Sequence, residues 1–145
     1  MSAPKWLSIA LDELSDGVVE VPGDGDNPRI VEFHSYTTLK ATDDETAWCS
    51  AFLCFCMEKG GYASTKSAAA RSWLNWGTPC PRDRIGAVVI LKRGTSTWQG
   101  HVTLFLGRTP NGNLICLGAN QNDSVSVSVY SKQDLLGMRW PKDAE

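Results

Sequence analysis

The stretch HVTLFLGRTPNGNLICLGAN, residues 101–120, decides the fold, because two apolar segments flank a turn. The Asn111-Gly112 pair within that turn is a strong short-range signal for a β-hairpin. The following segment SVSVSVY, residues 124–130, alternates in polarity and predicts a further strand. The preceding segment RIGAVVILKRG, residues 84–94, is a β-branched apolar run that predicts a buried strand. Together these segments predict an antiparallel meander.

The N-terminal half shows helical periodicity instead. Residues 5–15, KWLSIALDELS, carry apolar residues at helical spacing and predict a first helix. Residues 42–59 predict a second helix, with either Thr42 or Thr46 as its N-cap. Residues 66–76 predict a third helix. A glycine follows each predicted helix, at positions 17, 60 and 77.

The order of these elements predicts the fold class. Residues 21–30, VPGDGDNPRI, are rich in turn-forming residues and predict a loop. Helices that precede an antiparallel meander are typical of an α+β fold. A chain of 145 residues is long enough for one core, so we expect a single catalytic domain over residues 1–145.

Composition excludes several classes of function. The net charge of −2 leaves no basic surplus for binding nucleic acid. The N-terminus lacks the pattern of a signal peptide, and no apolar run is long enough to span a membrane. Five cysteines in a chain without an export signal argue against a disulfide framework. The sequence contains no C-x-x-C pair, which argues against a zinc site. We therefore expect no metal, no cofactor, no nucleic acid and no membrane partner.

Cys49 is the candidate nucleophile. It follows Trp48 within the first two turns of the helix predicted over residues 42–59. The unpaired N–H groups and the positive dipole end of a helix start stabilise a thiolate, and later an oxyanion. The other four cysteines fall in apolar patterns or turns and are expected to be core residues.

A thiol nucleophile needs a base, and His101 is the candidate because it opens the first strand of the hairpin. A two-residue hairpin at Asn111-Gly112 would pair residue i with residue 223 − i, which sets Thr103 opposite Asn120 and His101 opposite Asn122. Asn120 would then be a diagonal neighbour of His101 on one face and could accept the imidazole N–H. A four-residue loop preserves this arrangement, whereas a three-residue loop would send one of the two to the opposite face.

The segments AWCSAF (47–52), GHV (100–102) and GANQND (118–123) resemble the Cys-His-Asn set of the CHAP and NlpC/P60 superfamily of papain-like peptidoglycan hydrolases. The resemblance continues through WLSIALDEL, EVPGDGDNPRIVEFH, DDETAWCSAF, SAAARSWLNWG and GMRWP. Together these segments resemble a small bacterial and phage subfamily of presumed cell-wall amidases or endopeptidases. The resemblance implies a papain-like fold, in which N-terminal helices pack on an antiparallel β-sheet. It also implies that Cys49 is the nucleophile, His101 the general base and acid, and Asn120 the orienting residue.

The chain departs from the family pattern at the third catalytic residue. Many CHAP domains carry a glutamate two residues before the asparagine, where this chain has Gly118. Many NlpC/P60 members use a third-position histidine, and here none is available. Gln121 is therefore the alternative to Asn120.

Further residues are candidates for substrate contact. Trp48 and Trp98 could line a glycan or peptide cleft, and the loop of Trp98 leads directly into His101. Asp44 could contact a substrate amine, and Gln121 is the fourth candidate for substrate binding. Tyr36 is a candidate oxyanion donor.

The expected function is hydrolysis of a peptidoglycan amide bond, as an endopeptidase or as an N-acetylmuramoyl-L-alanine amidase. The expected setting is a monomeric phage endolysin, made in the cytoplasm and acting on the periplasmic cell wall after release. Alternatives are an injected antibacterial effector with an immunity protein as partner, an acyltransferase or deamidase of papain-like type, and a wall-binding module that has lost catalysis.

Overall fold

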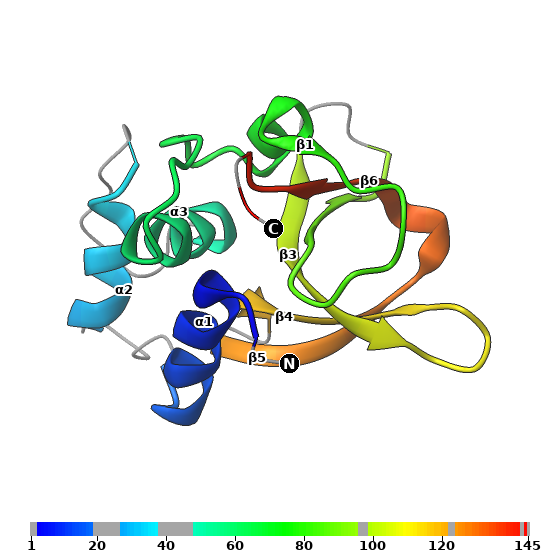
Figure 1. Cartoon of the computed structure of the whole chain (residues 1–145). Coiled ribbons are helices and arrows are strands. Elements are labelled where there is room, and N and C mark those ends of the chain that lie inside the picture. Colours follow the sequence, from blue (N-terminus) through cyan, green and yellow to red (C-terminus); the bar gives the residue numbers. More distant parts are fainter. Residues whose placement is uncertain are drawn as a thin grey trace.

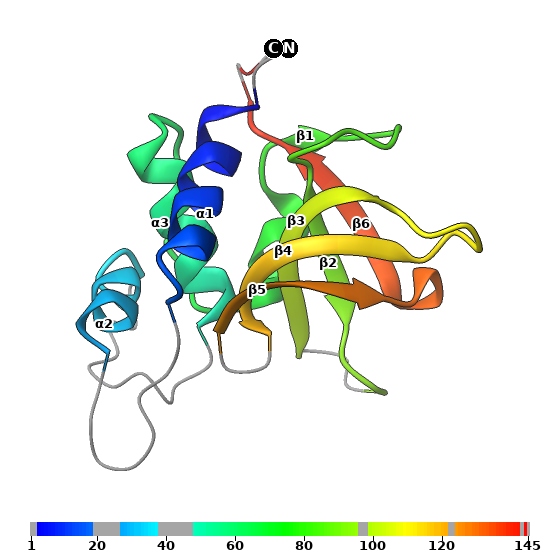
Figure 2. The ribbon, with the colours of Figure 1, turned by 90° about the horizontal axis from the view of Figure 1, so that it is seen from below.

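The structure is a computed structural model of the chain, and it describes residues 3–18, 27–37, 48–95, 99–121, 124–142 and 144, with only the backbone of Asn120. Within these residues the fold is α+β, as the sequence predicts: helices form one layer and a six-stranded antiparallel sheet forms the other. Figures 1 and 2 show helices α1, α2 and α3 together on one side and the strands on the other. Helix α3 lies between the other two helices and strands β3 and β4.

Helix α1 (Lys5–Ser15) has the predicted bounds. It buries Trp6, Leu7 and Ala10, which lie at helical spacing on one face. The chain leaves the helix at Gly17, whose φ of +70° is a left-handed conformation that favours glycine.

Helix α2 (Pro28–His34) corrects the prediction of a loop over residues 21–30, since the helix takes up the last three of them. Asn27 caps it by accepting a 2.8 Å hydrogen bond from the N–H of Arg29. Pro28 supplies a backbone angle suited to the first helical turn. The Asn-Pro pair is therefore a helix start, although it is also typical of turns.

Helix α3 (Cys49–Lys59) begins later than the predicted residue 42. Trp48 is its N-cap residue, with the non-helical angles φ −123° and ψ 13°. The two predicted N-caps, Thr42 and Thr46, lie outside the described residues. Gly60 follows the last helical residue, as predicted. Cys49 is thus the first residue of the helix.

The helix predicted over residues 66–76 is replaced by a shorter 3₁₀-helix, η1 (Ala70–Asn75). Lys66 has φ 55°, which an α-helix cannot contain. Polar groups before η1 form hydrogen bonds within their own segment and with helix α3. Such bonds compete with the backbone bonds of an α-helix.

The sheet has the strand order β1-β6-β2-β3-β4-β5. The predicted meander is confirmed as the consecutive pairs β2–β3, β3–β4 and β4–β5, all antiparallel. The sequence did not predict that the last strand returns to pair with β2 and with the short first strand. The bounds are β1 (Thr78–Pro79), β2 (Val88–Lys92), β3 (Gly100–Arg108), β4 (Leu114–Gln121), β5 (Ser124–Tyr130) and β6 (Leu135–Trp140).

The hairpin between β3 and β4 has a longer loop than the two-residue hypothesis assumed. Arg108 pairs with Leu114, so five residues connect the strands. A bulge then shifts the register, and Leu104 pairs with Leu117. The predicted pairing of i with 223 − i is therefore wrong, because loop length and bulge together move the partner by two residues.

The core lies between the two layers. Helix α3 is buried almost all round, from Cys49 to Met57, because helices cover one side and the sheet the other. Phe33 of α2 packs against Phe52 and Phe55 of α3, with ring centroids 5.2 Å and 4.8 Å apart. In the part of the chain that the structure describes, no helix has the length and apolarity to cross a membrane.

Candidate active site

The structure brings Cys49 and His101 together from the two layers. Cys49 opens helix α3, and His101 is the second residue of strand β3. Each residue is 5% exposed. The thiol and the imidazole interact electrostatically, and the backbone of Val102 also acts on the sulfur.

The electrostatics of this pair favour its charged form. Burial alone would raise the pKa of the Cys49 thiol, but the hydrogen bond and charge of His101, the Val102 N–H and the charge of Arg93 outweigh it, and the pKa is lowered. Burial likewise disfavours a charged His101, yet its bonds and charge interaction with Cys49 and its bond with Gln121 raise its pKa. The two pKa values therefore approach each other from opposite sides, which favours a thiolate–imidazolium pair.

Two other buried cysteines, Cys56 and Cys116, lack this activation. Burial raises the pKa of Cys56 well above its ordinary value and that of Cys116 to about 12. Among the described residues, no imidazole acts on either thiol to offset the loss of solvation. The contrast with Cys49 shows that its lowered pKa comes from its particular neighbours.

The first turn of α3 presents N–H groups next to the nucleophile. The first helical hydrogen bond runs from the N–H of Phe52 to the carbonyl of Trp48 at 2.9 Å. The N–H groups of residues 49, 50 and 51 therefore precede the helical ladder, and Trp48 gives them no side-chain cap. Together with the helix dipole they can stabilise negative charge on the sulfur and on an adjacent oxyanion.

Ser50, the residue after Cys49, anchors this helix start. Its hydroxyl donates to the carbonyl of Ser67 at 2.6 Å and accepts from the indole N–H of Trp73 at 2.8 Å. All three residues lie in different segments, so the bonds fix α3 against both η1 and the loop before it. Both Ser50 and Trp73 are fully buried.

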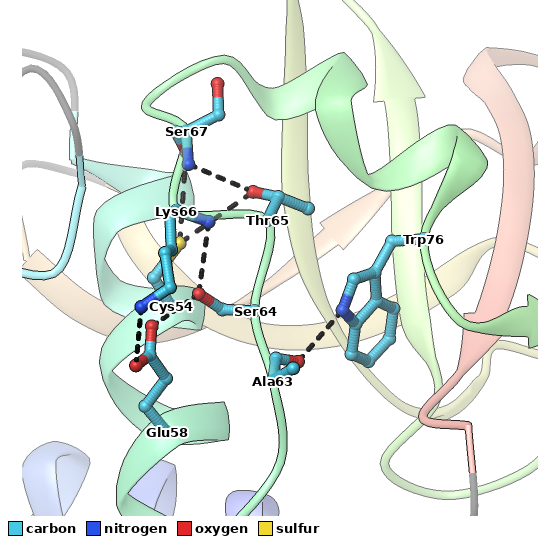
Figure 3. A network of polar contacts seen from close by, with 8 residues as sticks. All are labelled: Cys54, Glu58, Ala63, Ser64, Thr65, Lys66, Ser67 and Trp76. Carbon is cyan, nitrogen blue, oxygen red and sulfur yellow. Dashed lines mark hydrogen bonds and ion pairs between the residues drawn. The ribbon is translucent and has the colours of Figure 1, made fainter.

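The loop that carries Ser67 is itself tied to helix α3 by polar contacts (Figure 3). Glu58 accepts from the hydroxyl of Ser64 at 2.7 Å and pairs with Lys66 at 3.3 Å. Thr65 accepts from the N–H of Ser67 at 3.2 Å. These contacts hold the Ser67 carbonyl within hydrogen-bond distance of the Ser50 hydroxyl.

On the side away from Cys49, the imidazole of His101 contacts Gln121. The distance from His101 Nε2 to Gln121 Oε1 is 3.0 Å. Gln121 Oε1 also lies 2.9 Å from the hydroxyl of Thr103, and Gln121 Nε2 donates to the carbonyls of Ser126 at 2.8 Å and Cys116 at 3.4 Å. These contacts occupy both ends of the carboxamide, and flipping it would set its oxygen against the carbonyls of Ser126 and Cys116.

The fixed carboxamide assigns the tautomer of His101. Gln121 Oε1 can only accept, so Nε2 carries the proton that it accepts. The other nitrogen, Nδ1, is buried and has no hydrogen-bond partner among the described residues. An Nε2–H tautomer leaves Nδ1 free to take a proton from a thiol.

A bulge explains why Gln121 meets His101. Strand β4 pairs Gly118 with Ser126 and Gln121 with Ser124, so the register of β4 against β5 shifts between residues 118 and 121. An extra residue in a strand reverses which side chains face a given side. Gln121 thereby lies on the face of Thr103 and His101.

Gly118 is the residue that makes room for this carboxamide. A Cβ there would lie 2.4 Å from Thr103 Oγ1 and 2.9 Å from Gln121 Oε1. The predicted pairing set Thr103 opposite Asn120, but it is Gly118 that lies against Thr103. The side chain of the predicted orienting residue, Asn120, lies outside the described part, so its role stays a prediction.

Tyr130, which the sequence did not indicate, is a second neighbour of His101. Its hydroxyl lies 3.1 Å from His101 Nε2, and the two rings are 5.1 Å apart. Tyr130 pairs with Leu114 at the end of β4 remote from Gln121, so the contact depends on the curvature of the sheet that Figure 2 shows. Neither motif nor spacing carries a signal for a contact of this kind.

The remaining predicted site residues are placed as follows. Trp48 does not line a cleft: it is fully buried and stacks on Phe33 at 6.0 Å, which corrects the expectation of substrate contact. Tyr36 packs edge-on against Phe55 at 5.5 Å. Asp44 and Trp98 lie outside the described residues. Among the residues that the structure describes, no three potential ligands of types His, Cys, Asp or Glu gather into a metal site.

Comparisons with protein-family models, with curated proteins and with solved structures found no match for this chain. The chemistry of the site therefore has to be argued from its own residues.

Proposed function

We propose that this protein is a cysteine hydrolase that cleaves an amide bond of peptidoglycan, with Cys49 as nucleophile and His101 as general base and acid. The single observation that carries the proposal is that Cys49 at the start of α3 interacts with His101 of β3, and that its thiol has a lowered pKa although it is buried. By contrast, burial raises the pKa of the Cys56 and Cys116 thiols.

The reaction begins with attack of the Cys49 thiolate on the carbonyl carbon of the amide. The carbonyl π electrons move to oxygen, and the N–H of Cys49 at the start of α3 stabilises the resulting oxyanion. The His101 imidazolium gives its Nδ1 proton to the leaving nitrogen as the C–N bond breaks, which releases an amine and leaves a thioester. Neutral His101 then takes a proton from water as the water oxygen attacks the thioester carbon. The C–S bond breaks, which returns the Cys49 thiolate beside the His101 imidazolium and releases the acid product.

Gln121 serves as the orienting group in this scheme. Throughout the cycle Nε2 keeps its proton, and Gln121 Oε1 accepts it at 3.0 Å. Asn120 was the first choice for this role by the family resemblance, and Gln121 the alternative. The described geometry supports Gln121.

The substrate class comes from the resemblance of the sequence to the CHAP and NlpC/P60 superfamily. A helix that carries the cysteine and packs on an antiparallel sheet that carries the histidine is consistent with the papain-like arrangement of that superfamily. A phage endolysin is the setting we favour, with an injected effector and its immunity protein as the other route for the same chemistry.

The test is digestion of purified sacculi from several wall types by the wild type, by Cys49→Ala and by Cys80→Ala. Cys80 is a matched control because it is half-buried, and its thiol bonds only the carbonyl of Arg82 among the described residues. We expect new free amines with wild type and Cys80→Ala, and a loss of at least about 1000-fold with Cys49→Ala. Mass spectrometry of the fragments identifies the bond. No release from any wall type would contradict the cell-wall assignment.

Acyl transfer to an amine is the second candidate. The observation that favours it is the 5% exposure of Cys49, since a thioester shielded from water reacts more readily with a bound amine. Addition of amino acid or peptide amines to the digestion distinguishes the two reactions. A transferase would form new amide products, whereas a hydrolase would release acids.

A further inference from the structure

Tyr130 brings a second oxygen to the imidazole nitrogen that Gln121 already contacts. Its hydroxyl lies 3.1 Å from His101 Nε2, and the Gln121 oxygen lies 3.0 Å from the same atom. The two oxygens come from different strands, β5 and β4. His101 is 5% exposed, so these protein groups replace most of the water that an imidazole would otherwise bind.

The donors and acceptors around His101 Nε2 decide whether the Tyr130 hydroxyl donates or accepts in this contact. If the phenol donated to Nε2, that nitrogen would present a lone pair, and the oxygen of Gln121 would face it at 3.0 Å as acceptor against acceptor. The carboxamide cannot escape by flipping, because its N–H groups bond the carbonyls of Ser126 and Cys116. The Nε2–H tautomer removes this conflict, and its proton then has two acceptors.

Tyr130 remains a neutral phenol in the site. Burial raises its pKa above the ordinary range, negative charge on Cys116 or Cys49 would act in the same direction, and Ser128 offsets this only in part. A neutral phenol oxygen accepts a shared hydrogen bond without adding a charge to the site. The dipole of the phenol hydroxyl therefore stabilises the charged imidazole.

We propose that Tyr130 is a positioning residue of the proposed hydrolase, whose hydroxyl oxygen is the second acceptor of the His101 Nε2–H and holds the imidazolium that protonates the leaving amine. The inference rests on the proposed function for its catalytic meaning. The bonding itself can be measured without any substrate.

The experiment compares wild type, Tyr130→Phe and Tyr62→Phe. Tyr130→Phe keeps the ring that packs 5.1 Å from the imidazole and removes only the hydroxyl. Tyr62 is a control of the same type, because its ring packs edge-on against Trp6 at 5.2 Å and belongs to another cluster. The first readout is the pKa of His101 by NMR titration, which is tractable because the chain has only two histidines.

The hydroxyl is expected to support the charged imidazole, so its loss should lower the His101 pKa by about 0.4 to 1 unit. The alkaline limb of the activity profile should move down by the same amount, and kcat should fall about 3- to 10-fold with KM unchanged. Tyr62→Phe should change none of these. An unchanged His101 pKa in a folded Tyr130→Phe protein would overturn the proposal.

A second measurement needs no Tyr130 variant. Nitrogen-15 shifts of His101 in Cys49→Ala report which ring nitrogen holds the proton at high pH. The proposal requires the Nε2–H tautomer, and an Nδ1–H tautomer would overturn it because the phenol would then be the donor. If wild type shows the Nε2–H tautomer and the Tyr130→Phe pKa shift but releases nothing from sacculi, the positioning role survives and the substrate assignment fails.

Discussion

At the scale of single residues, the account depends on one sulfur and one imidazole that stabilise each other's charged forms. The interaction between them outweighs the effect of burial on each pKa: the pKa of Cys49 is lowered and that of His101 is raised despite the loss of solvation. The thiolate is lost as pH falls through the Cys49 pKa, and the imidazolium is lost as pH rises through the His101 pKa. Because these two groups titrate in the site, the activity profile should be bell-shaped.

Removal of His101 tests this coupling. In His101→Ala the thiol keeps its burial but loses its main compensating partner, so its pKa should rise. The alkylation rate of Cys49 near pH 6.5 should fall at least about tenfold, because each unit of pKa changes the thiolate fraction tenfold. His34→Ala is the control, since His34 is buried in helix α2. Equal rates in wild type and His101→Ala would contradict the coupling.

Gly118 offers a test of the carboxamide support. In Gly118→Ala the added Cβ would meet Thr103 Oγ1 at 2.4 Å and Gln121 Oε1 at 2.9 Å, so the carboxamide must move away from His101. We expect a loss of about 1–3 kcal/mol in the free energy of unfolding and a narrower pH profile of activity. The measurements are urea denaturation and the pH dependence of Cys49 alkylation.

The matched control is Gly107→Ala. Gly107 also lies in a strand of the hairpin, but a Cβ there meets nothing within 4 Å. It should leave both measurements close to wild type. Similar losses in the two variants would show that the crowding at Gly118 is not the cause.

At the scale of secondary-structure elements, the start of α3 sets the position of the nucleophile. Ser50 joins this start to the Ser67 carbonyl and to the Trp73 indole, in a buried position. The predicted effect of Ser50→Ala is a loss of about 1–3 kcal/mol in unfolding free energy, because two buried polar groups lose a partner.

Ser8→Ala provides the comparison for Ser50→Ala, since Ser8 is exposed on helix α1. Activity per folded molecule should also fall in Ser50→Ala, because the N–H groups beside Cys49 lose their anchor. Thermal unfolding and initial rates on sacculi measure both effects. A Ser50→Ala protein as stable as Ser8→Ala would show that the anchor is not needed.

The predictability of the elements follows from how local their signals are. Helix α1 and the meander were predicted, because periodicity and turn residues act over a few positions. The 3₁₀-helix η1 was predicted as an α-helix because its polar contacts with α3 are not visible in local sequence. The register of β3 and β4 depends on a bulge, which shifts pairing without a clear sequence signal.

The same distinction applies to the candidate site. Cys49 and His101 were identified because residue type and element start are local properties. Gln121 was only an alternative for the orienting role, since its direction depends on the bulge after Gly118. Tyr130 was missed, because it meets His101 only through the curvature of the whole sheet.

At the scale of the whole molecule, the site exists only where the helical layer meets the sheet. Trp6 of α1 joins the layers by donating its indole N–H to the carbonyl of Gly86 at 2.7 Å, and it packs edge-on against Trp140 of β6. Because Cys49 and His101 come from opposite layers, contacts that hold the layers together also hold the pair together.

Trp6→Phe should therefore weaken the joint between the layers. It removes a buried hydrogen bond and should lower the unfolding free energy by about 1–3 kcal/mol. Trp76→Phe is the comparison, because it also removes an indole bond to a carbonyl, that of Ala63 at 3.0 Å, but in an exposed setting. Guanidinium denaturation should show the larger loss for Trp6→Phe, and the opposite order would contradict this view of the interface.

The most direct test of the central claim is brief labelling of the native protein with limiting iodoacetamide at pH 6.5, followed by mass spectrometry of its peptides. Cys80 is the more exposed thiol and Cys49 the activated one, so exposure and activation predict different results. The expected result is that Cys49 takes most of the label and that His101→Ala abolishes this preference. Label on Cys80 with Cys49 unmodified would contradict it.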